Sequence, residues 1–341
     1  MKDYNKFLRE FNKKFAVFIR NKIKNSSSYS RFLPVNETYK YIEEISENGK
    51  RLRPYLAHLS FKPTKKTEGS FQLLFAIELL HIFCLIHDDI IDKSGKRHGI
   101  PTANKKFAEI YKDEHFGNSI ALLLGDIVFL WCVETINQLP PNTKNRQIII
   151  DNFYLNIDMV IYGQSLDVML VKIKKIDKNM VDKKMNLKTS NYSFYYPMLL
   201  GFLLGGRDYR KNKNLKAVAY NLGAGFQIKD DLLDCDIDNQ KNKSSFLDIE
   251  SGQHTLMSWY ITSIASKNHK YEFEKIFNKG KIQKKDYNKV RRLLNISGAT
   301  KYCEDAAKKH FALARKHLNL LQIEDKFLWL ELISHIETRT K

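Results

Sequence analysis

Two stretches of this chain, residues 71–92 and 217–236, are largely apolar around a helix, yet each carries a cluster of aspartates. Both clusters have the spacing D-D-x-x-D, and their six members are Asp88, Asp89, Asp92, Asp230, Asp231 and Asp234. A helix that is apolar all round is buried by its neighbours. A carboxylate buried there costs several kcal/mol unless a cation compensates it. The sequence therefore predicts core helices that bring carboxylates to a cation.

The spacing of the aspartates predicts what each cluster binds. Residues four apart share one face of a helix, so Asp88 stacks on Asp92 and Asp230 on Asp234. Two such clusters facing each other would form a cage of hard oxygen ligands suited to Mg²⁺ and, through the metal, to a diphosphate. We therefore expect a substrate site at the aspartates.

Composition limits the class of protein. The chain has 341 residues, 43% of them hydrophobic, and 57 Lys and Arg against 38 Asp and Glu, a formal net charge of +19. The lysines are scattered through loops without a nucleic-acid-binding motif, so we expect a basic solvated surface and no nucleic-acid partner. Helical periodicity without a convincing linker or strand pattern predicts one all-α domain over residues 1–341.

The sequence also bears on the cellular compartment. The four cysteines are isolated from one another, and the N-terminal stretch has no signal-peptide core. The longest apolar run, residues 120–133, is interrupted by Asp126 and is too short to span a bilayer. We expect a reduced, cytoplasmic protein without a transmembrane segment.

Further polar residues lie near the aspartates. His81 is on the line of Asp88, because seven residues make almost two helical turns. A lone buried histidine is usually a satisfied core residue, but this alignment favours a role in the site. Lys50 and Arg53 are three apart and are placed to converge on one phosphate group. After the first cluster, a Gly-Ile-Pro turn returns Arg97 towards the aspartates.

These pieces follow one another in a specific order. The segments are 49–54 (GKRLRP), 85–92 (LIHDDIID), 97–102 (RHGIPT), 125–126 (GD), 163–167 (GQSLD), 188–189 (KT) and 226–234 (FQIKDDLLD). In this order they resemble the trans-isoprenyl diphosphate synthases, the polyprenyl synthetase family that includes farnesyl and geranylgeranyl diphosphate synthases. The resemblance implies a single large all-α helical bundle around a central cavity, usually a homodimer. It implies a prenyltransferase that condenses isopentenyl diphosphate with an allylic diphosphate.

The resemblance also implies roles for individual residues. Mg²⁺ on the allylic diphosphate would be held by the six aspartates, with Asp88, Asp92 and Asp230 foremost. The same diphosphate would be gripped by Arg97, Lys188 and Lys243. Isopentenyl diphosphate would be held by Gly49, Lys50, Arg53, His81 and His98.

The carbocation left by ionisation needs negative dipoles and no nucleophile. The Thr189 hydroxyl and the Gln227 amide oxygen are candidates, and Lys188 would assist the departure of pyrophosphate. A third candidate is a backbone carbonyl, because Pro197 inside a helical pattern is predicted to bend the helix and free one. The remaining wall should be apolar and exclude water.

Two positions depart from the family pattern. His98 stands where the family usually has a second arginine that contacts isopentenyl diphosphate. Gln253 stands where the family usually has a lysine, in the stretch Gly252-Gln253-His254-Thr255. Both changes remove positive charge from diphosphate sites, which bears on affinity more than on the type of reaction.

Product length should depend on the side chains about one turn before Asp88. On a helical wheel Cys84 lies on the aspartate line, whereas Phe83 is turned away by more than a quarter circle. The resemblance instead singles out Phe83 as a size gate. A large ring beside a small Cys84 is consistent with a product of fifteen or twenty carbons.

Three other interpretations compete with a chain-elongating synthase. A catalytically silent partner subunit of a heteromeric synthase would explain the lost charges, but it would have no use for intact aspartates. A terpene cyclase would not need Lys50, Arg53 and His81 for a second diphosphate. A bare helical scaffold would have no reason to place six aspartates on core helices.

Overall fold

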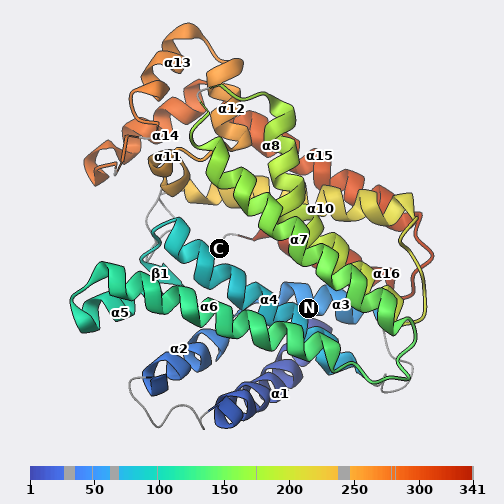
Figure 1. Cartoon of the computed structure of the whole chain (residues 1–341). Helices are drawn as coiled ribbons and strands as arrows, with labels where there is room; N and C mark the ends of the chain where they lie inside the picture. The colour runs from blue at the N-terminus through green and yellow to red at the C-terminus, as the bar shows by residue number, and fades with distance from the viewer. Residues whose placement is uncertain are drawn as a thin grey trace. The chain divides into compact units, whose positions relative to one another are not determined.

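A computed structural model describes residues 1–26, 35–47, 49–61, 69–97, 99–173, 175–236, 246–277, 279–280 and 282–339 (Figure 1). Two of the expected substrate ligands, His98 and Lys243, lie outside these residues. Their roles stay predictions.

Helices dominate the described chain, and the all-α class is confirmed. The helices are α1 (Lys2–Ser26), α2 (Val35–Glu47), α3 (Leu52–Phe61), α4 (Ser70–Ile91), α5 (Ala103–Tyr111), α6 (Glu114–Asn137), α7 (Arg146–Leu170), α8 (Lys178–Met185), α9 (Tyr196–Leu204), α10 (Lys213–Asp234), α11 (Leu247–Ser251), α12 (Leu256–Ser263), α13 (Lys267–Glu274), α14 (Tyr287–Ile296), α15 (Ala299–Asn319) and α16 (Lys326–Thr338). A π-helix, η2 (Asn186–Tyr195), and a 3₁₀ turn, η3 (Lys284–Asp286), complete the helical elements. Among the described residues the strands are β1 (Lys96–Arg97) and β2 (Ile100–Pro101), which pair antiparallel.

The chain divides into two compact units, which are described separately. The first comprises Met1–Asp151 and Leu200–Arg207, and the second comprises Asn152–Leu199 and Asp208–Lys341. Two of the boundaries fall inside α7 and α9, so the chain passes between units there without a loop. That one domain spans residues 1–341 stays a prediction.

In the first unit α4 packs along α6, and α6 packs along α5 (Figure 1). Aromatic side chains from α1 anchor the other side of α4. The Phe75 ring lies 5.6 Å from the Phe11 ring and 5.3 Å from the Phe15 ring, measured between centroids. This apolar packing fixes the helix whose last turn carries the first aspartate cluster.

A buried ion pair joins α4 to the segment before α3. The Arg51 guanidinium lies 2.5 Å from Glu78 Oε1, and the two side chains are 1% and 2% exposed. Arg51 also donates to Asn12 Oδ1 at 2.9 Å and to the backbone oxygen of Ser46. Gly49 makes room for it, because a Cβ atom there would lie 2.8 Å from the guanidinium. The pair therefore fixes the loop that carries Lys50.

In the second unit α10 packs along α15 and along η2 (Figure 1). Gly223 permits the contact with η2, since a Cβ atom there would lie 2.4 Å from Ser190 Cα. At Gly225 a Cβ atom would lie 3.0 Å from the Phe311 ring of α15. The small residues of α10 thus let both neighbours approach its backbone closely.

Two helices are long and apolar enough to cross a membrane by length and composition. They are α4, with 61% of its most apolar window buried, and α6, with 44% buried. The apolar run 120–133 lies within the 24-residue helix α6, so the length of that run alone does not decide the question, and the absence of a transmembrane segment stays a prediction. Buried core helices pass the same test, so this is weak evidence for membrane insertion.

Removing one partner of the buried Arg51–Glu78 pair should destabilise the protein. Glu78→Gln leaves the Arg51 charge buried without compensation, so we expect the free energy of unfolding to fall by ~3–5 kcal/mol. The exposed Glu10–Lys14 pair, whose charged atoms are 3.1 Å apart, gives a control. Glu10→Gln should lower the free energy of unfolding by less than ~1 kcal/mol. Urea unfolding followed by circular dichroism measures both. Equal losses in the two variants would contradict a stabilising role for the Arg51–Glu78 pair.

Candidate functional site

The first aspartate cluster occupies the end of α4. Asp92 is the C-cap of the helix, and its backbone N–H donates to the Asp88 carbonyl oxygen at 2.7 Å. Asp88 is half-buried and Asp92 is exposed, whereas Asp89 points to the other side and is 1% exposed. The cluster therefore offers two accessible carboxylates on one face and one buried carboxylate behind them.

The β1–β2 hairpin brings a cation to the buried carboxylate. Arg97 pairs with Ile100 across the ribbon, and its Nε donates to Asp89 Oδ1 at 3.0 Å. Burial raises the pKa of Asp89, and the Arg97 contact opposes that rise only in part. The pKa of Arg97 is raised, because the interaction with Asp89 outweighs its own burial. The predicted return of Arg97 to the aspartates is thus seen at Asp89, while its contact with substrate stays a prediction.

The donor chemistry of this cluster suits a hard divalent cation. Asp89 Oδ2 is buried and has no hydrogen-bond partner, so the carboxylate that Arg97 contacts keeps one oxygen with unused acceptor capacity. Within the described ranges, no group of three or more His, Cys, Asp or Glu converges to hold a metal ion. Mg²⁺ does not require such a group, because it keeps several waters and commonly binds one or two carboxylates plus substrate phosphates. The residues present therefore fit Mg²⁺ held jointly with a diphosphate.

The basic loop of the first unit presents its cations to solvent. Lys50 is exposed, and Arg53 is half-buried in the first turn of α3. The Tyr4 hydroxyl donates to the Lys50 backbone oxygen, which adds a second tie to the loop. His81 is half-buried on α4. Sequence reasoning missed the buried arginine between Lys50 and Arg53, although a glutamate inside the apolar α4 was a signal that a buried cation exists.

In the second unit a hydrogen-bonded chain leads from η2 to the second cluster. The Thr189 hydroxyl donates to Gln227 Oε1 at 2.6 Å, and Gln227 Nε2 donates to Asp231 Oδ1 at 2.9 Å. Thr189 lies in the π-helix, which ends immediately before Tyr196-Pro197. The helix is therefore irregular over the ten residues of η2, whereas the sequence predicted only a local bend at Pro197.

The second cluster contains one buried carboxylate and two half-buried ones, Asp230 and Asp234. Asp231 is 7% exposed, and burial raises its pKa well above the usual range. Asp234 accepts backbone N–H bonds from Leu247 and Asp248 at 3.2 Å each, which ties α10 to α11. Burial, reinforced by the nearby Asp248 carboxylate, raises the pKa of Asp234 to about 8. Without a nearby cation both carboxyl groups therefore favour the protonated form at neutral pH, and a bound cation would favour their ionised form.

The C-terminal segment supplies a cation to this cluster. Arg339 Nη2 lies 2.6 Å from Asp230 Oδ1 and donates to the Phe226 carbonyl oxygen at 2.9 Å. Its guanidinium stacks on the Phe226 ring at 3.8 Å, and its side chain is 10% exposed. Nothing in the motif pattern pointed to Arg339, because it lies more than a hundred residues beyond Asp230.

The motif Gly163 to Asp167 positions two lysines. Asp167 Oδ2 lies 2.6 Å from Lys188 Nζ, and Asp167 Oδ1 lies 2.8 Å from Lys184 Nζ. Gly163 allows this, since a Cβ atom there would lie 2.8 Å from the Lys188 backbone nitrogen. Burial opposes ionisation of Asp167, but the two lysines prevail and lower its pKa. Lys184 had not been expected in the site.

The stretch that replaces the expected lysine is largely structural. Thr255 caps α12 in a capping box with Ser258. A His254 ring nitrogen lies 3.0 Å from the Ile173 carbonyl oxygen, and burial lowers the His254 pKa. The Oε1 atom of Gln253 is buried without a hydrogen-bond partner.

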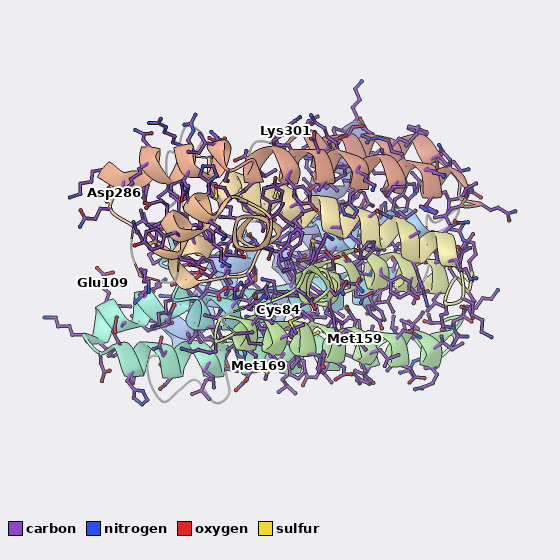
Figure 2. All side chains as sticks on the ribbon, turned by 90° about the horizontal axis from the view of Figure 1, so that it is seen from above. Cys84, Glu109, Met159, Met169, Asp286 and Lys301 are labelled. Atoms are coloured by element: carbon purple, nitrogen blue, oxygen red, sulfur yellow. The ribbon has the colours of Figure 1, made fainter. Side chains whose placement is uncertain are left out.

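The residues expected to set product length lie in the first unit. The Phe83 ring contacts the His87 ring at 4.6 Å and the Phe129 ring of α6 at 4.8 Å. Gly125 makes room for His87, since a Cβ atom there would lie 2.2 Å from its ring. Cys84 is half-buried (Figure 2). The roles of Phe83 and Cys84 stay predictions.

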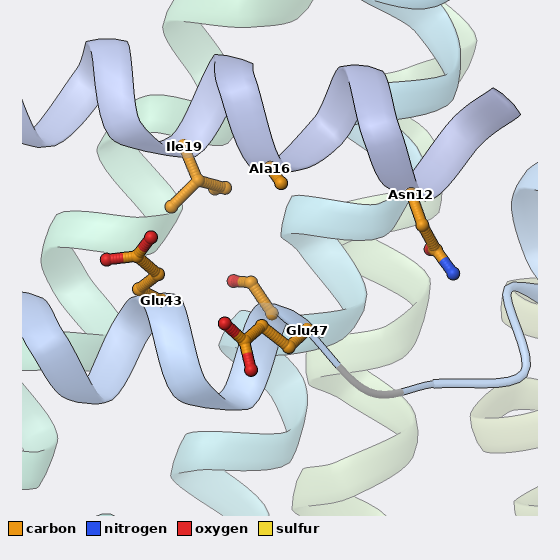
Figure 3. Close-up of a pocket in the computed structure, with 6 residues that line it drawn as sticks. Asn12, Ala16, Ile19, Glu43 and Glu47 are labelled. Carbon is orange, nitrogen blue, oxygen red and sulfur yellow. The ribbon is translucent and has the colours of Figure 1, made fainter. Parts of the chain in front are cut away.

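A small pocket in the first unit lies apart from these residues. It is lined from α1 and α2 by Asn12, Ala16, Ile19, Glu43, Ser46 and Glu47 (Figure 3). Two of these residues, Asn12 and Ser46, are partners of Arg51. None of the residues expected to contact substrate or metal lines it.

Comparison with known proteins places these motifs in a wider context. A family model described as polyprenyl synthetase matches residues 35–294. A geranylgeranyl diphosphate synthase of Saccharolobus solfataricus is 27% identical over 317 residues, covering 90% of this chain and 92% of that protein. The Methanosarcina mazei geranylgeranyl diphosphate synthase is 26% identical over 331 residues, covering 94% and 97%.

Solved structures show the same fold. A geranylgeranyl pyrophosphate synthase from Corynebacterium glutamicum, complexed with isoprenyl diphosphate and magnesium, superimposes with a TM-score of 0.84 at 22% identity, covering 96% of this chain and 99% of that one. The geranylgeranyl pyrophosphate synthetase of Pyrococcus horikoshii gives a TM-score of 0.76 at 24% identity, covering 97% and 99%.

Arg339 and a metal ion should compete for Asp230. Arg339→Gln removes the internal cation, so we expect Mg²⁺ to bind about three- to tenfold more tightly, the equivalent of ~1 kcal/mol for a partly exposed ion pair. The measurement is the rise in melting temperature with Mg²⁺ concentration, which reports binding to the folded state. Arg315→Gln is the control, because Arg315 pairs with Glu337 at 2.5 Å. An unchanged or weaker Mg²⁺ response in Arg339→Gln would refute competition.

Proposed function

Because the chain belongs to the polyprenyl synthetase family, we propose that it is a short-chain trans-prenyltransferase acting on isopentenyl diphosphate and an allylic diphosphate. The supporting observation is that both D-D-x-x-D clusters end core helices and adjoin cationic side chains. Asp89 contacts Arg97 at 3.0 Å, and Asp230 contacts Arg339 at 2.6 Å. Carboxylates beside cations suit a substrate that brings both a metal and a diphosphate.

The proposed reaction begins with ionisation of the allylic carbon–oxygen bond, whose electron pair leaves with pyrophosphate. Mg²⁺, when bound, offsets the charge of that leaving group. Lys188, and in the first unit Arg97, donate charge-assisted hydrogen bonds to phosphate oxygens. Mg²⁺ would be held in the first unit by Asp88 and Asp92, with Asp89 in support. In the second unit it would be held by Asp230, with Asp231 and Asp234 in support.

The carbocation is then captured by the second substrate. The Thr189 hydroxyl oxygen and the Gln227 amide oxygen, 2.6 Å apart, present dipoles whose negative ends stabilise the cation, and neither group carries a charge. The double bond of isopentenyl diphosphate attacks, forming one carbon–carbon bond, and pyrophosphate accepts the proton that is then lost. Lys50, Arg53 and His81 hold this second diphosphate.

We further propose a product of fifteen or twenty carbons, and the relatives named as geranylgeranyl diphosphate synthases favour twenty. A silent partner subunit is less well supported, because all six aspartates are intact. A terpene cyclase is less well supported too, because the family model extends over the basic loop at residues 49–54.

The assembly and location that we propose are a homodimer in the cytoplasm. Apolar side chains on the surface of α6 support self-association, since Leu122, Leu123 and Leu130 are 49%, 55% and 56% exposed. In the second unit, α7 exposes Met169 at 66% (Figure 2). Four free cysteines suit a reducing compartment.

Asp88→Ala and Asp230→Ala test the assignment of the metal ligands. Each should lower kcat by about 10³-fold or more, because several kcal/mol of charge stabilisation is lost at the departing pyrophosphate. Melting temperatures should stay near that of the wild type, since neither side chain is part of the buried core. Asp305→Ala, which removes the partner of Lys301 on α15 (Figure 2), is the control and should retain activity. Near-normal turnover of either variant at saturating Mg²⁺ would overturn the assignment.

Phe83→Ala tests the size gate. If the ring limits chain growth, its loss should give longer products at useful rates, which mass spectrometry of the extracted prenyl diphosphates would show. A ring that only packs against Phe129 would instead cost ~3–5 kcal/mol of stability without changing product length. Phe129→Ala separates the two roles, since it removes the packing partner and leaves the ring at position 83. A product distribution of Phe83→Ala identical to wild type would rule out the gate.

A further inference from the structure

Two lysines of the second unit share one carboxylate. Lys184 at the end of α8 and Lys188 in η2 lie 2.8 Å and 2.6 Å from different oxygens of Asp167. The three side chains are well covered, with 13%, 27% and 6% of their surfaces exposed. They therefore form a fixed group with two positive charges and one negative charge.

Two ammonium groups share one carboxylate in this group. Asp167 is ionised at neutral pH, because the two lysines keep its pKa low. Two positive charges and one negative charge give these three side chains a net charge of about +1. A half-buried group of this kind is suited to bind an anion.

The surroundings of Lys184 indicate where that anion would lie. Lys184 lies in the last turn of α8, which packs against α10, the helix of the second aspartate cluster, and against α12, which begins directly after the stretch 252–255. Lys184 is also within electrostatic reach of His254, whose pKa its charge helps to lower. That stretch carries Gln253, whose Oε1 is buried without a donor.

We propose that Lys184 is a diphosphate-binding residue that supplies, from α8, the positive charge missing at Gln253. Together with Lys188 it binds the diphosphate of the allylic substrate, so the inference rests on the proposed function. Asp167 orients both ammonium groups, and Gly163 lets η2 approach α7 closely enough for the pair to form.

A purely structural ion pair would behave differently. One lysine is enough to neutralise Asp167, so a structural role predicts that losing Lys184 changes stability but leaves anion affinity intact. A diphosphate-binding role predicts a loss of affinity that an added charge at position 253 restores. The two roles are therefore separable by binding measurements.

The experiment compares Lys184→Gln with Lys183→Gln, which removes the same charge from the adjacent, exposed lysine. Inorganic pyrophosphate is titrated into each full-length protein in the presence of Mg²⁺ by calorimetry, and KM for geranyl diphosphate is measured in parallel. We expect Lys184→Gln to weaken both constants about tenfold, as the loss of one charge-assisted hydrogen bond predicts, and Lys183→Gln to change neither. If Lys184→Gln and Lys183→Gln give the same pyrophosphate affinity and the same KM for geranyl diphosphate, the proposal is overturned.

Two rescue variants guard against a folding defect. Lys184→Arg retains the charge and should retain pyrophosphate binding. Adding Gln253→Lys to Lys184→Gln should recover most of the lost affinity, and absence of recovery in a protein with wild-type melting temperature would count against compensation. A different result would separate the two proposals. If the wild-type protein binds pyrophosphate through Lys184 but has no transferase activity, the proposed function is refuted and the anion site remains.

Discussion

Both units depend on the same physical constraint, which is that a carboxylate taken into an apolar helical core has to be matched by positive charge. Glu78 on α4 is matched by Arg51, and Asp89 on the same helix by Arg97. On α7 in the second unit, Asp167 is matched by two lysines. Each pair joins a helix to a residue outside that helix, between 8 and 27 residues away in the sequence, so charge compensation also helps to determine where the connecting segments lie.

The compensation is incomplete where a cation is expected to bind. Asp89 keeps one buried oxygen without a partner, and burial raises the pKa of Asp231 and Asp234. Fully matched carboxylates would hold their pKa values down, as Asp167 does. Burial also raises the pKa of Asp89 although Arg97 pairs with it, so a raised pKa reflects the depth of burial as well as the degree of charge compensation.

Much of this organisation could be predicted from the sequence, because helical periodicity and four-residue spacing are local properties. The helices around both clusters and the return of Arg97 follow from such patterns. The Arg51–Glu78 pair and the Arg339–Asp230 pair could not be predicted in the same way. Their partners are 27 residues apart in one pair and more than a hundred in the other, and only tertiary packing brings them together.

The π-helix around Thr189 could not be predicted from the sequence either, although the residues involved are close together in the chain. A proline was expected to bend the helix, yet the ten-residue π-helix ends before Pro197. A π-helix displaces each carbonyl from its usual partner and is frequent at functional sites. Close contacts at Gly163 and Gly223 from the two neighbouring helices bracket this segment and act on its backbone at Lys188 and Ser190. Pro197 also acts on this segment, because a proline crowds the carbonyl four residues earlier, which here belongs to Ser193 inside η2. The proline and the two close approaches thus act on the same backbone, which presents Lys188 and Thr189.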